Sequence, residues 1–202
     1  MATSDGLVQA GYDKVADIYN TRRHMWSNKK ELEDLVHRLP PGSAVLDAGC
    51  GSGYASLFLA RRGFRVTGID ISKQMLRLAK RKVPGATFLR MDMRKIDLPE
   101  KGFDGVVCLY AIFHVPRRSH QSILFRFGSL LKRGGFLMVL MGWDDYVGFE
   151  DDYLAKGTSM YWSYFDKETN LGMIKKAGFE IVWAKEDRKH DGTHLFVLAK
   201  KK

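Results

Sequence analysis

Cysteine, metal-ligand clusters and long apolar runs are all scarce in this sequence. Its 202 residues include only two cysteines, Cys50 and Cys108, which excludes a disulfide-stapled scaffold and fits a reducing compartment. No Cys/His spacing typical of a metal site occurs, so we expect no bound metal. No apolar run reaches the ~18 residues needed to cross a membrane, and the N-terminus lacks the basic-then-apolar pattern of a signal peptide. These absences predict a cytoplasmic protein without a membrane span.

Acidic residues are also few, since 23 Asp and Glu stand against 33 Lys and Arg, for a formal net charge of +10. An excess of this kind raises the possibility of a nucleic-acid partner. The basic residues are scattered, however, in small groups such as Arg61-Arg62, Lys80–Lys82 and Lys200–Lys202. Most fall on exposed faces or at the C-terminal ends of expected helices, where they suit the helix dipole. We therefore do not expect a nucleic-acid partner.

Glycine is plentiful, and three glycines stand at alternate positions after an apolar segment. The segment Ala44–Leu46 is apolar throughout, as a strand buried on both faces should be, and Asp47 follows at its carboxyl end. Gly49, Gly51 and Gly53 then precede a helical run. Glycines at such a turn let the chain reverse sharply and let backbone N–H groups approach a ligand. The Asp47 carboxylate would repel a phosphate, but it would accept hydrogen bonds from an ammonium group or from other polar N–H groups.

Two more carboxylates follow the next two expected strands. Residues 64–69 form the second expected strand, which ends at Asp70. A carboxylate at that place can accept hydrogen bonds from both ribose hydroxyls of a nucleoside. Residues 86–90 form the third expected strand and lead to Asp92. Because an open α/β sheet binds ligands outside the carboxyl ends of its strands, these positions predict a nucleoside-binding cleft.

The ordered motifs resemble those of class I S-adenosylmethionine-dependent methyltransferases. The D-x-G-x-G-x-G arrangement resembles the first motif of that family, residues 103–110 the fourth, and residues 130–137 the entry into the fifth strand. The resemblance implies S-adenosylmethionine as the methyl donor and S-adenosylhomocysteine as the product, with Asp92 near the adenine amino group and its neighbour against the ring. The residues that it implies for cofactor binding are Tyr12, Tyr19, Asp47, Gly49, Cys50, Gly51, Gly53, Asp70, Ile71, Met75, Asp92, Met93 and Leu109.

Strand and helix patterns alternate along the chain, which predicts one doubly wound, Rossmann-like α/β domain over residues 1–202. Residues 119–133 show helical spacing of apolar side chains, and the apolar run 136–141 reads as a central strand. Two further apolar runs, 179–183 and 194–199, read as a closing hairpin. The family resemblance implies the same architecture: seven mostly parallel strands, an antiparallel last strand inserted beside the sixth, and helices on both faces.

Residues 143–165 differ in composition from the rest of the chain. Eight of these 23 residues are aromatic and five are acidic, against one lysine. The segment leaves the fifth expected strand at its carboxyl edge, so we expect it to form a lid over the methyl acceptor. Such a lid suits an apolar or weakly cationic small molecule, for example an amine; packing of the aromatics into the core is the alternative. The residues expected to contact the acceptor are Tyr110, Trp143, Tyr161, Trp162 and His194.

Residues 1–40 are expected to form a helical cap. Tyr12 and Tyr19 lie seven residues apart, on one helical face. The resemblance implies that this helix folds over the cofactor, where both tyrosines would keep water from the methyl donor; a plain docking stripe is the alternative. His114 follows the fourth strand at the edge where the methyl group should point, and with a pKa near neutrality it could serve as a general base. Binding of a backbone carbonyl at a helix start is the other interpretation of His114.

Methyl transfer requires alignment of the nucleophile, the methyl group and the sulfur more than it requires a dedicated base. Three alternatives to a small-molecule methyltransferase therefore stay open. An RNA- or protein-directed methyltransferase would carry a basic surface around the cleft, and the acidic lid disfavours it. A nicotinamide oxidoreductase is disfavoured by Asp47 and by the third glycine. A module that binds S-adenosylmethionine without turnover would look the same in sequence.

Overall fold

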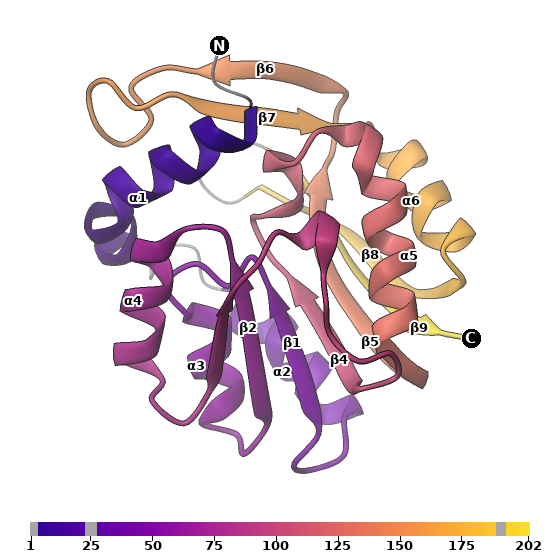
Figure 1. Ribbon diagram of the computed structural model, residues 1–202. Coiled ribbons are helices and arrows are strands. Elements are labelled where there is room, and N and C mark those ends of the chain that lie inside the picture. The colour runs from indigo at the N-terminus through magenta and orange to yellow at the C-terminus, as the bar shows by residue number, and fades with distance from the viewer. Residues whose placement is uncertain (1–3, 23–27, 189–192) are drawn as a thin grey trace.

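A computed structural model describes residues 4–22, 28–188 and 193–202. Its centre is a seven-stranded sheet in the order β3-β2-β1-β4-β5-β9-β8 (Figure 1). The strands are β1 (Ala44–Ala48), β2 (Arg65–Asp70), β3 (Thr87–Arg90), β4 (Phe103–Cys108), β5 (Leu131–Gly142), β8 (Phe179–Asp187) and β9 (His194–Lys201).

The pairing of the strands confirms the predicted sheet. β1 to β5 pair in parallel with their neighbours, whereas β9 pairs antiparallel with β5 on one side and with β8 on the other. The antiparallel last strand is therefore inserted between β5 and β8, as expected. The burial of β5 from Gly135 onward and of β9 from Leu195 to Ala199 explains their unbroken apolar sequences.

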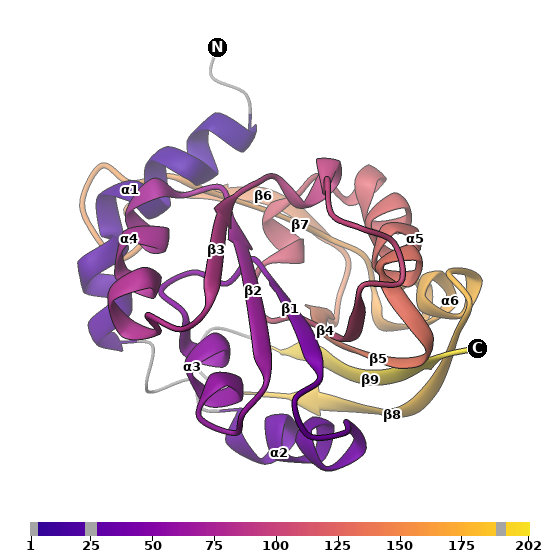
Figure 2. The same ribbon diagram turned by 60° about the horizontal axis from the view of Figure 1, so that its bottom comes forward.

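Helices cover both faces of this sheet (Figure 2). The helices α5 (His120–Leu130) and α6 (Lys167–Lys176) bury Phe127 and Ile174 in one hydrophobic cluster. On the other face, α2 (Lys29–Arg38) and α3 (Tyr54–Ala60) bury Leu35 and Phe58 in a second cluster. The helix α4 (Lys73–Lys82) begins at Ser72, whose hydroxyl accepts the Met75 N–H as an N-cap, and it packs beside β2 and β3.

The junction of α5 and β5 differs from the sequence prediction. The helix expected over 119–133 ends at Leu130, and β5 begins at Leu131, well before the expected residue 136. The reason lies in Gly134 and Gly135, which continue the strand instead of ending the helix. Gly135 packs so closely on β4 that an added Cβ would lie 2.9 Å from the Asp104 carbonyl oxygen.

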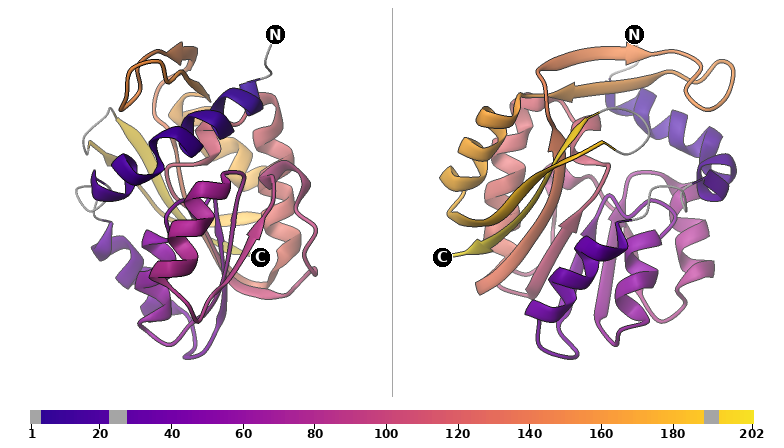
Figure 3. Two further views of the ribbon diagram at one scale, coloured as in Figure 1. Left: turned by 60° about the vertical axis from the view of Figure 1, so that its left-hand side comes forward. Right: turned by 180° about the vertical axis from the view of Figure 1, so that it is seen from behind.

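The expected lid is a separate two-stranded antiparallel sheet, β6 (Tyr146–Glu150) and β7 (Met160–Tyr164). It lies over the carboxyl edge of the main sheet, and the helix α1 (Ser4–Arg22) lies against it (Figures 1 and 3). Lys14 on α1 donates hydrogen bonds to the carbonyls of Lys156 and Gly157 in the β6–β7 connection. Within the expected cap 1–40, α1 therefore covers the ligand edge, whereas α2 packs on a face of the sheet.

Candidate active site

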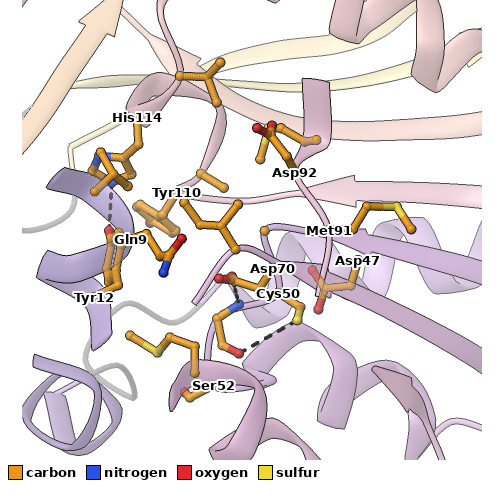
Figure 4. Close-up of a pocket in the computed structure, with 18 of the residues that line it drawn as sticks. Gln9, Tyr12, Asp47, Cys50, Ser52, Asp70, Met91, Asp92, Tyr110 and His114 are labelled. Atoms are coloured by element: carbon orange, nitrogen blue, oxygen red, sulfur yellow. Dashed lines mark hydrogen bonds between the residues drawn. The ribbon is translucent and has the colours of Figure 1, made fainter. Parts of the chain in front are cut away.

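A cavity of about 410 Å³ lies between α1 and the carboxyl ends of β1, β2, β3 and β4 (Figure 4). Its size falls within the range of small-molecule sites. The following residues expected from the sequence line it: Tyr12, Tyr19, Asp47, Gly49, Cys50, Gly51, Asp70, Ile71, Met75, Asp92, Met93, Leu109, Tyr110 and His114. The cavity thus brings together segments from α1, the glycine turn and three further strand ends.

The glycine turn forms the floor of the cavity. The N–H groups of Gly49 and Cys50 both donate to the Ile69 carbonyl, at 2.8 and 3.0 Å, which joins the turn to β2. Gly49 has a φ of +73°, and a Cβ there would lie 2.3 Å from the Cβ of Ala111. A larger residue is therefore excluded both by its backbone conformation and by the close approach of the segment after β4.

Asp70 stands at the end of β2 with its carboxylate in the cavity wall. Its two oxygens accept hydrogen bonds from the N–H groups of Gly51 and Ser72, each at 2.8 Å. Burial raises the pKa of Asp70 to about 6, although these two N–H groups favour the charged form. The side chain is thus fixed in place, and its ionised form is a strong acceptor for the hydroxyls of a ligand.

Asp47 and the cysteines lie deeper. The Asp47 carboxylate is only 2% exposed and accepts a hydrogen bond of 2.6 Å from the Ser56 hydroxyl. Burial raises the pKa of Cys50 and of Cys108 above the ordinary thiol value. Both sulfurs therefore stay protonated and inert.

Asp92 has a partner that the sequence analysis did not identify. Both of its carboxylate oxygens accept hydrogen bonds from the Arg94 guanidinium, and one also accepts the Arg94 backbone N–H. Burial works against the charged form, yet Arg94 holds the pKa of Asp92 below its usual value. An adenine amino group would share this carboxylate with Arg94. Met93 beside it is buried and lines the cavity.

His114 joins three segments of the chain. It lies in the short 3₁₀ helix Ile112–His114, with its Nδ1 2.9 Å from the Tyr161 carbonyl oxygen and its Nε2 2.7 Å from the Tyr12 hydroxyl. A carbonyl only accepts, so Nδ1 carries the proton, and Nε2 accepts the hydrogen bond that Tyr12 donates. Burial lowers the pKa of His114 to about 4. The expectation of a pKa near neutrality is therefore wrong, and the imidazole is neutral.

Five expected site residues do not line the cavity. Gly53 packs against α4, where an added Cβ would lie 3.2 Å from Ala79. The ring of Trp143 is covered by the Lys167 ammonium, which lies 4.8 Å from the centre of the Trp143 ring. Tyr161 contributes only its carbonyl to His114. The two others, Trp162 and His194, pack against aromatic side chains next to the cavity. The ring centre of Trp162 lies 4.4 Å from that of His114, and the ring centre of His194 lies 5.5 Å from that of Phe113.

The acids of the lid are also turned away from the cavity. Asp145 pairs with Arg117, Asp151 accepts the Ser159 hydroxyl, and Asp152 accepts the Gly157 N–H. None of these acids is among the lining residues. The lid therefore presents no carboxylate to an amine in the cavity. Its aromatics do not all pack into the core either, since Tyr146 and Phe149 are exposed.

Several lining residues were missed by the sequence analysis. Examples are Gln9 on α1 and Ala111 and Val115 around His114. Gln9 precedes Tyr12 by three residues and so lies beside it on the helix, which is the one local signal that pointed to it. No group of three or more His, Cys, Asp or Glu residues suited to a metal occurs in the described part of the chain.

Comparison with known proteins agrees with this geometry. Residues 45–135 match a family described as a methyltransferase domain. An uncharacterized methyltransferase of Synechocystis sp. is 32% identical over 171 residues, which span 78% of this chain and 77% of that protein. A ubiquinone biosynthesis O-methyltransferase of Dechloromonas aromatica is 41% identical over 146 residues, 63% of this chain and 60% of that protein. This chain belongs to the class I S-adenosylmethionine-dependent methyltransferases.

A solved relative has the same fold as this methyltransferase. The 1,6-didemethyltoxoflavin-N1-methyltransferase of Burkholderia thailandensis, solved with its substrate and S-adenosylhomocysteine, superposes with a TM-score of 0.73 at 20% identity. The match covers 100% of this chain and 92% of that one. S-adenosylmethionine is the cofactor, and S-adenosylhomocysteine is the product.

The residues of the cavity fit this cofactor. The carboxylate of Asp70 is fixed by Gly51 and Ser72, so it can accept ribose hydroxyls without moving. At Gly49 the space that a side chain would take is filled by Ala111, so the turn can hold only glycine there. Tyr19 on α1 lies over that turn, since its ring would be 4.0 Å from a Cβ at Gly51.

Proposed function

We propose that this methyltransferase acts on an uncharged small molecule with an O–H or N–H nucleophile, and that Tyr12 and His114 together accept its proton. The observation that carries the proposal is the hydrogen bond of 2.7 Å between the Tyr12 hydroxyl and His114 Nε2 in the wall of the cavity. This pair lies beside the segment after β4, and the Tyr12 ring also packs edge-on against Tyr19, with 5.6 Å between the ring centres. The pair therefore stands next to the residues expected to hold the methyl donor.

The cover of the cavity supports a small acceptor. The helix α1 lies over it, and His114 is only 5% exposed. A nucleobase or protein side chain held in a macromolecule would have to displace α1 and its hydrogen bonds to the β6–β7 connection. Two relatives support the same class: one is named for O-methylation in ubiquinone biosynthesis, and the other for N1-methylation of 1,6-didemethyltoxoflavin.

The lining residues next to Tyr12 and His114 along the chain support an uncharged acceptor. The lining residues that neighbour this pair along the chain are Gln9, Ala111 and Val115, and none is charged. The charged lining residues belong to the ends of β1, β2 and β3, where the sequence places the methyl donor. The earlier expectation of an amine thus receives no support from the lid.

S-adenosylmethionine supplies, when bound, a methyl group on a positively charged sulfur that becomes a neutral thioether. As the nucleophile is methylated, its O–H or N–H bond breaks and the proton moves to the Tyr12 oxygen. Tyr12 passes its own proton to His114 Nε2, and the Tyr161 carbonyl stabilises the resulting imidazolium through Nδ1–H. A histidine of pKa about 4 suffices because the nucleophile becomes strongly acidic while it is methylated.

Titration calorimetry with S-adenosylhomocysteine, with NAD as the control ligand, is the first test. Micromolar binding of S-adenosylhomocysteine alone is expected. Binding of NAD alone would contradict the proposed donor site.

Turnover is then measured as release of S-adenosylhomocysteine from S-adenosylmethionine with a panel of simple phenols and nitrogen heteroaromatics. For an acceptor that is turned over, Y12F and H114Q should lower kcat by about 10²–10⁴-fold, as loss of a general base does, while S-adenosylhomocysteine affinity stays within twofold. Full activity in both variants would show that the pair is structural. Failure of the wild-type protein to methylate any member of the panel would contradict the acceptor class.

A further inference from the structure

The helix α1 presents an ordered row of side chains to the cavity. Tyr19 lies over the glycine turn, Tyr12 reaches His114, and Val8 packs against Tyr153 and Met160 of the lid. Successive residues of a helix advance by about 1.5 Å, so the row runs along α1 from Tyr19 at the glycine turn, past Tyr12, whose ring touches Tyr19, toward Val8. Gln9 stands one turn beyond Tyr12 in this row and lines the cavity.

The polar side chains of the cavity wall are otherwise engaged in hydrogen bonds. Asp70 accepts from backbone N–H groups, Asp92 holds Arg94, Arg90 donates to the Ile71 carbonyl, and Tyr110 donates to Asp187. The amide of Gln9 makes no hydrogen bond with any residue in the described part of the chain. Figure 4 shows this amide turned into the cavity.

We propose that Gln9 recognises the methyl acceptor through a paired hydrogen bond. A carboxamide offers a C=O acceptor and an N–H donor side by side, and so it matches a ligand edge that carries an N–H next to a C=O. Residues 9 and 12 are i and i+3 on the helix, with Cβ atoms about 5–6 Å apart, so one aromatic ring with its substituent can reach both. The acceptor class is therefore an uncharged aromatic molecule with an amide-like edge beside its nucleophilic O–H or N–H.

This inference rests on the proposed function, because it assumes that the acceptor lies beside Tyr12 and His114. Gln9 lines the cavity beyond Tyr12 in this row, on the side away from Tyr19. The donor end is marked by Tyr19 and the glycine turn, ten residues along α1, which is about 15 Å of helix. The test below also shows whether Gln9 instead binds the methyl donor.

The test measures binding of two matched phenols to the protein saturated with S-adenosylhomocysteine. The probes are 2-hydroxybenzamide, which has the amide edge, and methyl 2-hydroxybenzoate, which has the C=O but no N–H. The variants are Q9L, which keeps the size of the side chain, and Q121L, the same replacement on α5, where Gln121 donates to the Met173 carbonyl outside the cavity. Wild-type protein and Q121L should bind the amide about tenfold more tightly than the ester.

In Q9L this tenfold preference should disappear, while S-adenosylhomocysteine affinity stays within twofold and so shows that the variant is folded. Equal affinities of the two probes for the wild-type protein, or an unchanged preference in Q9L, would overturn the role of Gln9. A loss of S-adenosylhomocysteine affinity in Q9L would instead assign Gln9 to the donor and also overturn it. Absence of S-adenosylhomocysteine binding to the wild-type protein is a different failure, that of the proposed function.

Discussion

At the scale of single residues, Asp70 shows how burial and ligand binding oppose each other. The carboxylate is fixed by two backbone N–H groups, but burial raises its pKa to about 6. Only the ionised form accepts hydrogen bonds from both ribose hydroxyls. The apparent affinity for S-adenosylhomocysteine should therefore fall about tenfold per pH unit below pH 6, as the ionised fraction falls.

Calorimetry between pH 5 and 8 measures this dependence, with D70N as the comparison. The variant lacks the charge, so it should bind at least about tenfold more weakly at pH 8 and show no such slope. A wild-type affinity that is constant down to pH 5 would mean that ionised Asp70 does not bind the donor.

Asp92 gives the opposite lesson about single residues. The sequence placed it correctly after the third strand, and the structure places it in the cavity wall. Its hydrogen bonds to Arg94 were not foreseen, because a side chain two residues away can turn toward or away from a carboxylate without any change in the sequence pattern. Its contact with adenine stays a prediction.

At the scale of elements, two features require glycine at position 49 of the turn: its positive φ and the close contact with Ala111 after β4. Gly49 has φ +73° and touches Ala111, whereas Gly63 has φ +81° with open space around it. Both G49A and G63A should lose about 1–3 kcal/mol of unfolding free energy from the strained backbone. G49A should lose about 1–3 kcal/mol more, because the new methyl group overlaps the segment after β4.

Urea unfolding of the two variants and the wild-type protein measures this difference. Equal losses in G49A and G63A would show that the segment after β4 moves away at little cost. His114 lies in the short helix that follows Ala111. In that case the contact between Gly49 and Ala111 would not fix the position of this helix.

The lid shows where element prediction failed. Its aromatic and acidic composition was recognised, but the hairpin β6–β7 was not. The strand β6 contains Gly148, and in the connection to β7 both Asp152 and Leu154 have positive φ. Trp143 and Trp162 do not line the cavity, and both rings pack against other side chains, so their contact with the acceptor stays a prediction. Composition indicates an unusual segment, but it does not say which side of that segment faces a ligand.

At the scale of the whole molecule, two neutral histidines determine how the fold responds to acid. Burial lowers the pKa of both His114 and His120 to about 4, whereas an unfolded chain titrates near 6.5. Between these values the unfolded state binds protons that the folded state does not, so stability should fall as the pH falls from about 6.5 to 4. Asp70 acts in the other direction over part of this range, since its raised pKa favours the folded state at lower pH.

Urea unfolding at pH 7 and pH 5 measures the net effect, and H120Q isolates one contribution. His120 is fully buried and bonded through Nε2 to the Val115 carbonyl, which a glutamine amide can replace. The variant should lose less stability than the wild-type protein between the two pH values. An identical loss would show that His120 takes up a proton in the folded protein without penalty.

The sequence by itself determined the doubly wound sheet, its antiparallel last strand and the strand ends that meet at the cavity. Each of these follows from local patterns: apolar strands, the glycine turn, and Asp70 and Asp92 after their strands. The carboxyl ends of parallel strands must meet at one edge, so residues placed there by local pattern are brought together by the fold itself.

Only the tertiary structure decided the part of the cavity around Tyr12 and His114. There, α1 folds back across the sheet and brings Tyr12 to His114, 102 residues away, while β7 supplies the Tyr161 carbonyl 47 residues beyond His114. Such contacts depend on how a helix and a hairpin pack over an edge. They leave no periodic trace in the sequence, because each partner satisfies its own local pattern equally well without the other.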